Sequence, residues 1–352
     1  MQNAIKFSIA GAIVAAVILT SLPLSKGIGA GNAFAPAGPE QKTIRIGYFA
    51  SLGHAPAVIG LGNGDYKKHF QGDVEVKGQV FDSGPSAIEA LFANQIDVAY
   101  VGPNPTINGY MQSHGDAFRV IAGAASGGVL FVVRNDSGIQ SVHDFAGKTF
   151  ASPQLGNTQD VALRSYLVAN GYRPDGDVRV LPATNSDIMT LMQKKSIDGA
   201  WVPEPWGTRL VHEANTHVFL DERSLWKGGQ FVTTNLIART DFLERNPTLI
   251  KNLLEATVDE TNWINSHPDD ARADFNAQLK ILTGKSLPDS ELREAFSHVQ
   301  FTFDPLKATL LKSANDAYTI GFLKQEPQLG GLYDLSALAE VLRSKGLPPI
   351  SQ

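Results

Sequence analysis

Several short polar turns hold backbone and side-chain groups that could bind a small ligand. One of them, residues 152–160 (SPQLGNTQD), joins the end of an expected strand to the start of an expected helix. Gly156 permits close approach of the backbone, and Asn157 or Thr158 can begin the helix. Free amides at a helix start, with about half a positive charge from the macrodipole, bind an anion without a lysine. In the alternative interpretation, Asn157 or Thr158 only caps the helix, so an anion site here requires other polar loops opposite it.

Three further candidates lie at other expected strand-to-helix turns. Ser83 either donates a hydrogen bond to a ligand or caps the helix that follows it. His54 follows the first expected strand and is a candidate donor or cation, although a lone histidine is often structural. Asn104 offers an amide donor and acceptor in a loop that its flanking prolines stiffen.

The remaining candidates lie where two halves of the chain are expected to meet. Gly127 and Gly128 would permit close passage of the backbone at the junction. Trp206 could contact the organic part of a ligand, or it could fill a core. Glu204 would receive an ammonium group or bond nearby amides, and Thr233 would touch a ligand or serve only in a hinge.

A doubled motif suggests how these turns are positioned. Residues 96–101 (IDVAYV) and 197–202 (IDGAWV) each follow a helical pattern and lead into a proline-bearing loop. An apolar run of this kind fits a buried parallel strand, and ligands bind outside the carboxyl ends of such strands. The loops 102–105 and 203–206 are therefore expected to face one another across a cleft. Two unrelated core strands are the alternative.

Alternating strand and helix patterns predict an α/β fold with parallel strands and right-handed crossovers. The pattern starts at Thr43, restarts near residue 135 and returns to the first half around residues 231–238. We predict a discontinuous lobe 1 at 43–134 and 235–352 and a lobe 2 at 135–234, joined by two segments that permit a hinge. The helices after Thr240 are expected only to pack.

Composition excludes several classes of function. The 352 residues are 43% hydrophobic and 18% charged, which predicts a globular chain with one or two cores. A formal net charge of −5 and the lack of a basic stripe argue against a nucleic-acid partner. The absence of cysteine removes thiol nucleophiles, Fe–S clusters, zinc fingers and disulfides.

Catalytic and metal-binding motifs are also absent. There is no G-x-S-x-G elbow and no phosphate loop, and residues 212–217 (HEANTH) are one residue too long for H-E-x-x-H. We therefore expect no enzyme, no cofactor and no metal site.

The amino terminus has the order of a secretory signal. Lys6 precedes an apolar segment at 7–20, and small residues follow through Ala35. We expect residues 1–35 to be a signal peptide, cleaved after Ala30 or Ala35. The alternative is an uncleaved membrane anchor, because the apolar stretch approaches the roughly 20 residues that span a bilayer. Both interpretations predict a periplasmic or other extracytoplasmic protein.

Five segments together resemble a known family: 44–48 (IRIGY), 81–84 (FDSG), 96–102 (IDVAYVG), 152–158 (SPQLGNT) and 198–205 (DGAWVPEP). The chain resembles the extracytoplasmic substrate-binding proteins of ABC importers for aliphatic sulfonates, taurine and nitrate. The resemblance implies a two-lobed type II periplasmic binding protein fold with mainly parallel sheets and a hinge. It points to ligand loops at His54, Ser83, Asn104, Gln154 to Thr158 and Glu204 to Trp206.

The resemblance implies a passive, monomeric receptor. It would capture a small organic anion, an aliphatic sulfonate, and deliver it to a membrane permease with its ATPase. Helix amides, Ser83, Asn104 and Thr158 would hold the ligand oxygens. The alternatives are a nitrate, bicarbonate or thiamine-precursor type of binding protein, or a ligand-occupied sensor subunit. Enzymes of the wider superfamily depend on cysteine chemistry, and this chain has no cysteine.

Overall fold

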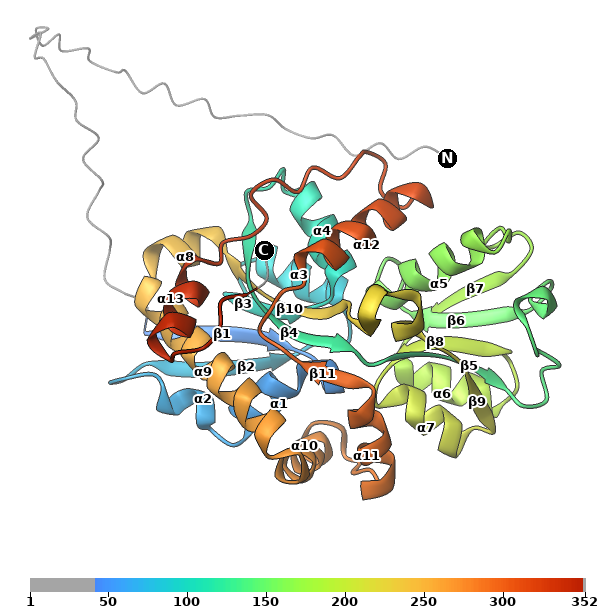
Figure 1. Ribbon diagram of the computed structural model, residues 1–352, viewed down its shortest axis with the longest axis horizontal. Helices are drawn as coiled ribbons and strands as arrows, with labels where there is room; N and C mark the ends of the chain where they lie inside the picture. The colour runs from blue at the N-terminus through green and yellow to red at the C-terminus, as the bar shows by residue number, and fades with distance from the viewer. Residues whose placement is uncertain (1–41, 351–352) are drawn as a thin grey trace, which may run out of the picture. The chain divides into compact units, whose positions relative to one another are not determined.

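The computed structural model describes residues 42–350, and the strands among them form two sheets (Figure 1). Sheet A contains β1 (Thr43–Tyr48), β2 (Glu75–Val80), β3 (Val98–Val101), β4 (Phe118–Gly127), β10 (Val232–Arg239) and β11 (Val299–Phe301). Sheet B contains β5 (Val129–Arg134), β6 (Thr149–Pro153), β7 (Arg179–Ala183), β8 (Gly199–Pro203) and β9 (Thr216–Asp221).

Helices follow most of these strands. With sheet A go α1 (Ala55–Gly62), α2 (Asp65–Lys68), α3 (Gly84–Phe92), α4 (Pro103–Gln112), α8 (Thr240–Arg245), α9 (Pro247–Ser266), α10 (Pro268–Thr283), α11 (Asp289–Ser297), α12 (Lys307–Thr319) and α13 (Ser336–Ser344). With sheet B go α5 (Thr158–Ala169), α6 (Asn185–Gln193) and α7 (Trp206–Glu213). Short 3-10 helices are η1 (Leu52–His54), η2 (Val142–Asp144), η3 (Glu222–Leu225) and η4 (Lys227–Gly229).

The predictions for residues 1–35 lie outside the described residues. Between residues 42 and 350, no helix has both the length and the apolar character needed to span a bilayer.

The two sheets share one strand order. Sheet A reads β11-β4-β10-β3-β1-β2, and sheet B, taken from its other edge, reads β9-β5-β8-β6-β7. Apart from the extra edge strand β11, each strand of one sheet has a counterpart in the other. The doubled motif falls on β3 and β8, which hold the same place in their sheets. It therefore marks equivalent strands, not two unrelated ones.

The sheets are mixed, which corrects the expectation of mainly parallel sheets. Strand β1 pairs parallel with β2 and β3, and β6 pairs parallel with β7 and β8. Strands β10 and β5 instead pair antiparallel with both of their neighbours. Each of these two strands enters its sheet from the other half of the chain. It therefore begins at the edge where the parallel strands end.

The predicted lobe boundaries also need correction at both crossings. Residues 129–134 were assigned to lobe 1, but they form β5 and pair with β8 and β9 in sheet B. Residues 232–234 were assigned to lobe 2, but they belong to β10 in sheet A. The chain passes from sheet A to sheet B at 127–128 and returns through 222–231. The sequence does not reveal the first crossing, because β4 and β5 form one apolar run that is interrupted only by two glycines.

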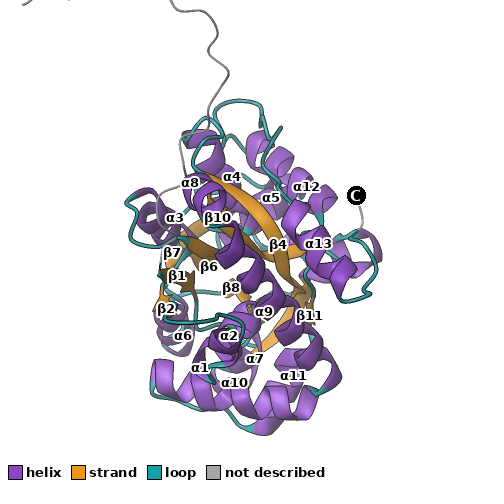
Figure 2. Ribbon diagram, turned by 90° about the vertical axis from the view of Figure 1, so that its left-hand side faces the viewer, coloured by secondary structure: helices purple, strands orange, loops and turns teal. Residues whose placement is uncertain are grey.

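Helices cover both faces of each sheet (Figure 2). In β3, Val98 and Tyr100 join the core under α1, α9, α10 and α13, whereas Ala99 and Val101 join the core under α3, α4 and α12. In β5, alternate residues likewise face α5 on one side and α6 and α7 on the other. Side chains of a strand alternate between faces, so strands buried on both faces are apolar throughout.

Candidate functional site

A cavity of about 620 Å³, here called the cleft, lies between the loops that follow the strands of the two sheets. Parallel strands of one sheet end at the same edge, so their following turns gather there. Sheet A contributes Phe49, Ser51, His54, Phe81, Asp82, Gly102, Thr233 and Thr234, and sheet B contributes Asn157, Thr158, Gln159, Thr184, Met189, Trp206, Arg209 and Glu213. Thr158 and Trp206 thus line the same cavity, as predicted, whereas Asn104, expected to lie with them, does not.

Five helices begin at the wall of the cleft. Their N-cap residues are His54 for α1, Gly102 for α4, Asn157 for α5, Thr184 for α6 and Pro205 for α7, and all five line the cavity. The first amides of a helix have no partner within the helix, and side chains cap only one at each of three starts: Thr158 N of α5, Asp187 N of α6 and Thr208 N of α7. Each helix start also carries about half a positive charge. The cleft therefore combines donors and positive potential from both halves, which suits a small anion.

A buried carboxylate shapes the turn before α5. Asp160 is fully buried and accepts hydrogen bonds from Ser152 Oγ (2.9 Å), Gly156 N (3.0 Å) and Arg164 Nε (3.0 Å). Gly156 takes a left-handed conformation, with φ of 77°. Asp160 thus folds the turn back onto the helix and positions its first residues. The sequence pattern predicts the turn but no role for this aspartate.

Asn157 and Thr158 differ in what their side chains do. Asn157 Oδ1 accepts a hydrogen bond from Thr158 N at 3.0 Å, so the capping interpretation is confirmed for Asn157. Thr158 Oγ1 is buried and has no hydrogen-bond partner among residues 42–350. A hydroxyl left in that state in the cleft wall is available to a ligand.

His54 is neutral, which rules out its proposed role as a cation. Its side chain is 4% exposed, and burial lowers its pKa to about 3. Phe49 N donates a hydrogen bond to His54 Nδ1 at 3.3 Å, and the Phe49 ring stacks on the imidazole with centroids 4.3 Å apart. The free proton therefore lies on Nε2, and His54 can serve as a neutral donor.

Trp206 and Arg209 form a stacked pair on the sheet B wall. The Arg209 guanidinium carbon lies 4.4 Å from the centroid of the Trp206 ring. Arg209 also binds both carboxylate oxygens of Glu213, at 2.7 Å and 3.1 Å. Its charge is therefore already compensated inside the protein. Trp206 presents an apolar surface that a carbon chain can contact.

The predicted junction residues lie at the crossings and also line the cleft. Gly127 and Gly128 have φ of 75° and 72°, and a Cβ on Gly127 would lie 2.7 Å from the carbonyl oxygen of His298. Both positions thus need glycine for conformation and for space. Thr233 Oγ1 donates to the Ala125 carbonyl at 3.1 Å and ties β10 to β4.

Five predicted residues do not lie on the cleft wall: Ser83, Asn104, Gln154, Gly156 and Glu204. Ser83 Oγ bonds to Ser86 Oγ (2.9 Å), Gln154 is exposed, and Asn104 lines a separate, second cavity. Glu204 accepts from Thr208 N (3.1 Å) and Thr208 Oγ1 (2.9 Å), so it bonds a nearby amide. Burial raises the pKa of this carboxyl.

Some of the wall was missed, because it comes from helices expected only to pack. Leu279 and Leu282 of α10 line the cleft, as do Lys285 and Leu287 in the loop that follows. These residues lie more than 70 positions from any predicted site residue except Thr233 and have no motif of their own. The packing of α10 against α1, α9 and α11 brings them to the cleft.

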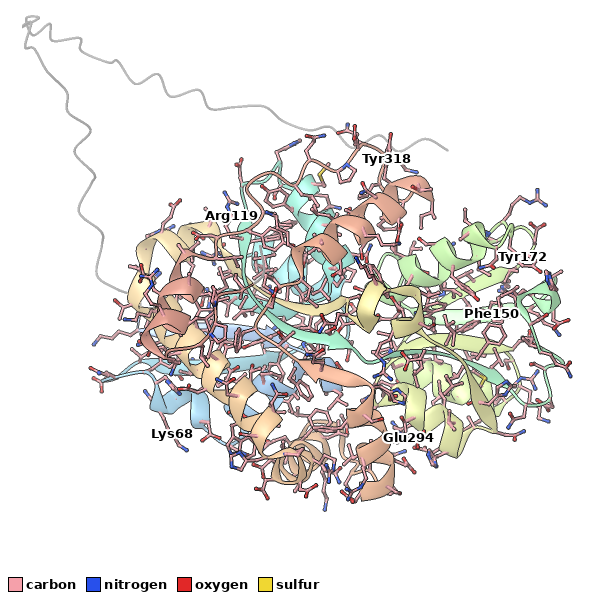
Figure 3. All side chains as sticks on the ribbon, in the orientation of Figure 1. Lys68, Arg119, Phe150, Tyr172, Glu294 and Tyr318 are labelled. Carbon is pink, nitrogen blue, oxygen red and sulfur yellow. The ribbon has the colours of Figure 1, made fainter. Side chains whose placement is uncertain are left out.

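Direct contacts join the two halves beside the cleft. Leu52 N of η1, in the half that contains sheet A, donates a hydrogen bond to the Glu204 carbonyl oxygen of the other half at 3.0 Å. On α11, Glu294 Oε2 lies 2.8 Å from His212 Nε2 of α7, and Figure 3 shows Glu294 at this junction. A Cβ on Gly102 would lie 2.3 Å from Thr158 Oγ1. The structure thus holds the two halves close together.

Comparisons with known proteins agree with this fold. The model of the NMT1-like family matches residues 37–279. The taurine-binding periplasmic protein of Escherichia coli (strain K12) is 24% identical over 230 residues, covering 65% of this chain and 69% of that protein. The nitrate/nitrite binding protein NrtA of Nostoc sp. is 26% identical over 254 residues, covering 66% and 57%.

Among solved structures, the alkanesulfonate-binding protein SsuA from Xanthomonas axonopodis pv. citri bound to MOPS matches with a TM-score of 0.71. It is 17% identical, and the match covers 85% of this chain and 100% of that chain. The predicted resemblance and the two-sheet α/β fold are confirmed.

Proposed function

The chain belongs to the NMT1-like family, and on this basis we propose that it is the substrate-binding protein of an ABC importer. It captures a small organic anion, an aliphatic sulfonate, in the cleft and delivers it to a membrane permease with its ATPase. The ligand oxygens bind Thr158, His54 and the amides at the helix starts, and Trp206 contacts the carbon chain.

One observation carries the anion assignment: five helix starts from both halves line one cavity whose walls offer few uncompensated charges. His54 is neutral, and Arg209 is held by Glu213. Lys285 and Asp82 are exposed charges of opposite sign. Attraction for an anion therefore arises mainly from helix dipoles and neutral donors.

The size and lining of the cleft favour an organic anion over nitrate or bicarbonate. A volume of about 620 Å³ falls in the roughly 300–1,000 Å³ range of pockets that hold organic ligands. Part of the cleft wall is apolar, and an inorganic ion would leave it without a contact. This part consists of Met189, Trp206, Leu279 and Leu282. Burial of a carbon chain there contributes about 0.8 kcal/mol per CH₂.

Ligand capture is proposed to close two lobes about the crossings at 127–128 and 222–231. The lobes are those of sheets A and B, and the contacts of Leu52 with Glu204 and of Gly102 with Thr158 belong to the closed arrangement. Closure excludes water from the anion, which strengthens its interactions with the helix ends.

The ligand class is tested by isothermal titration of the full chain with ethanesulfonate, hexanesulfonate, nitrate, bicarbonate and an uncharged pyrimidine. We expect saturable 1:1 binding of the sulfonates, tighter for the longer chain, and no binding of nitrate. Binding of the uncharged compound alone would defeat the anion assignment. Tighter binding of nitrate than of either sulfonate would defeat the organic part of it.

Export and delivery are tested in cells. We propose that residues 1–35 direct export, which sequencing of the mature amino terminus and fractionation check. Loss of sulfonate uptake on deletion of the gene supports delivery to a permease. Uptake that continues unchanged while a response to sulfonate is lost supports a sensor instead.

A further inference from the structure

A second cavity of about 270 Å³ lies on the α5 and α12 side of the strands, whereas α6, α7 and α10 line the cleft. The two sets of helices lie on opposite sides of the strands (Figures 1 and 2). Thr158 lines both cavities and so lies between them. The walls of the second cavity come from both halves and from the crossing segment 222–231.

Glu222 supplies a buried carboxylate to this cavity. Its side chain is 4% exposed and accepts hydrogen bonds from Trp201 Nε1 (2.7 Å) and Trp226 Nε1 (3.3 Å). Each of its oxygens can accept a further bond. Glu222 makes no ion pair within residues 42–350, and the nearby Lys312 pairs with Asp316 at 2.5 Å. A buried carboxylate without a cationic partner is costly, so this site favours a positive ligand.

The aromatic rings around Glu222 suit the same kind of ligand. Trp226 stacks on Phe231 with centroids 5.2 Å apart, and Tyr166 lies 5.4 Å from Trp201. All four rings line the cavity. Indole and phenol faces attract an ammonium group, and the attraction is stronger when the group is desolvated. Lys312 Nζ lies over the Trp226 ring, 4.9 Å from its centroid, and Phe231 covers the other face, so a second cation must lie against the other rings.

A further group points to an oxygen on the ligand. Asn104 Nδ2 is buried and has no hydrogen-bond partner in the described part of the chain. Asn104 is 4% exposed and lines the second cavity but not the cleft. Most buried polar groups in proteins are paired, so an amide donor left free here indicates an acceptor.

We propose that the second cavity binds a small organic ammonium ion that carries an oxygen acceptor. Its charge lies against Glu222, among the aromatic rings, and its oxygen accepts a hydrogen bond from Asn104 Nδ2. The ligand differs in charge from the anion of the cleft. Since both halves contribute walls, it binds best when the halves are as close as they are in this structure.

The test is isothermal titration of the full chain with choline at pH 8, in sodium chloride that matches the ionic strength. We expect saturable 1:1 binding, weakened at least tenfold in E222Q and weakened in tetramethylammonium, which lacks the hydroxyl. E260Q is the matched control, because Glu260 is also buried but lines neither cavity. No binding to the wild-type chain, or equal binding to E222Q, overturns the proposal.

Two further measurements separate this site from the cleft. Choline binding must persist when hexanesulfonate saturates the chain, and competition between them overturns the second site. If the chain binds no sulfonate but binds choline through Glu222, the proposed function fails and this inference stands. A purely structural Glu222 would change thermal unfolding of E222Q and leave choline binding unchanged.

Choline binding should also depend on pH. Burial raises the pKa of Glu222 to about 7, with Asp221 raising it and the indole N–H groups and Lys312 lowering it. Only the ionised carboxylate attracts an ammonium group, so we expect about tenfold weaker binding at pH 6 than at pH 8. Asp316, the other acid at the cavity, is paired with Lys312. E222Q must lose this pH dependence.

Discussion

Gly102→Ala tests whether the two halves close at the contact between α4 and α5. Gly102 has φ of −71° and ψ of 163°, which alanine adopts without strain. Its Cβ would lie 2.3 Å from Thr158 Oγ1, where real Cβ contacts are not shorter than 3.0 Å. Because Thr158 is buried and β-branched, it cannot move aside freely. The added methyl must therefore push the halves apart.

Overpacking of this kind costs about 1–3 kcal/mol, which corresponds to roughly 5- to 150-fold weaker ligand binding. Isothermal titration with ethanesulfonate measures the loss, and urea unfolding should change little because the halves can separate without ligand. Gly330→Ala is the matched control, since nothing lies within 4 Å of its Cβ. In a double-mutant cycle, Gly102→Ala in a Thr158→Ala background should cost nothing further. Binding of Gly102→Ala within twofold of wild type would refute closure at this contact.

Three other outcomes follow from the same contacts. Trp206→Ala should weaken hexanesulfonate binding by roughly tenfold and ethanesulfonate binding by less, because the ring covers the carbon chain; an equal loss for both in titration would contradict this. Asp160→Ala should cost about 3 kcal/mol in urea unfolding, since it removes the acceptor of Ser152 Oγ, Gly156 N and Arg164 Nε, and a loss below about 1 kcal/mol would show that the turn holds without it. The hydrogen bond with Asp221 raises the pKa of His298. The pKa of Asp221 is lowered overall, because burial acts to raise it but the hydrogen bonds from His298 and Arg223 outweigh burial. The stability from the raised His298 pKa is complete below about pH 6.5 and is lost as pH rises through the folded value, while that from Asp221 is lost as pH falls below about 4. His298→Asn should therefore cost more stability at pH 5.5 than at pH 9, and a cost independent of pH would refute the pairing.

Local patterns predicted the elements that carry the site. Strand and helix periods placed β3, β8 and α5 close to their observed bounds, and glycine, proline and capping residues marked the turns. Parallel strands share an edge, so predicting the strands also predicted that the turns at His54, Thr158 and Trp206 would meet. This part of the site follows from topology, which short-range signals determine.

The rest depends on packing over long distances. A turn residue can face the cleft or the helix that follows, and the sequence does not distinguish Thr158 from Ser83 in this respect. Asn104 lies in the first turn of α4, and there it lines the second cavity. The sequence pattern places Asn104 in a loop, which does not determine the direction of its side chain. Two features depend on how the halves pack together: the α10 residues in the cleft wall and the antiparallel direction of β5 and β10. The local hydrophobic period of the sequence contains no information about this packing.

The charge pattern links the binding site to closure. The exposed Lys285 at the cleft attracts an anion with the halves open or closed, whereas dipoles at helix starts act only within about one turn. The starts of α4 and of α5 to α7 come from opposite halves, so a ligand contacts all of them only when the halves meet. An anion held by helix ends thus binds the closed arrangement more tightly than the open one. That difference in affinity is what shifts the population toward closure.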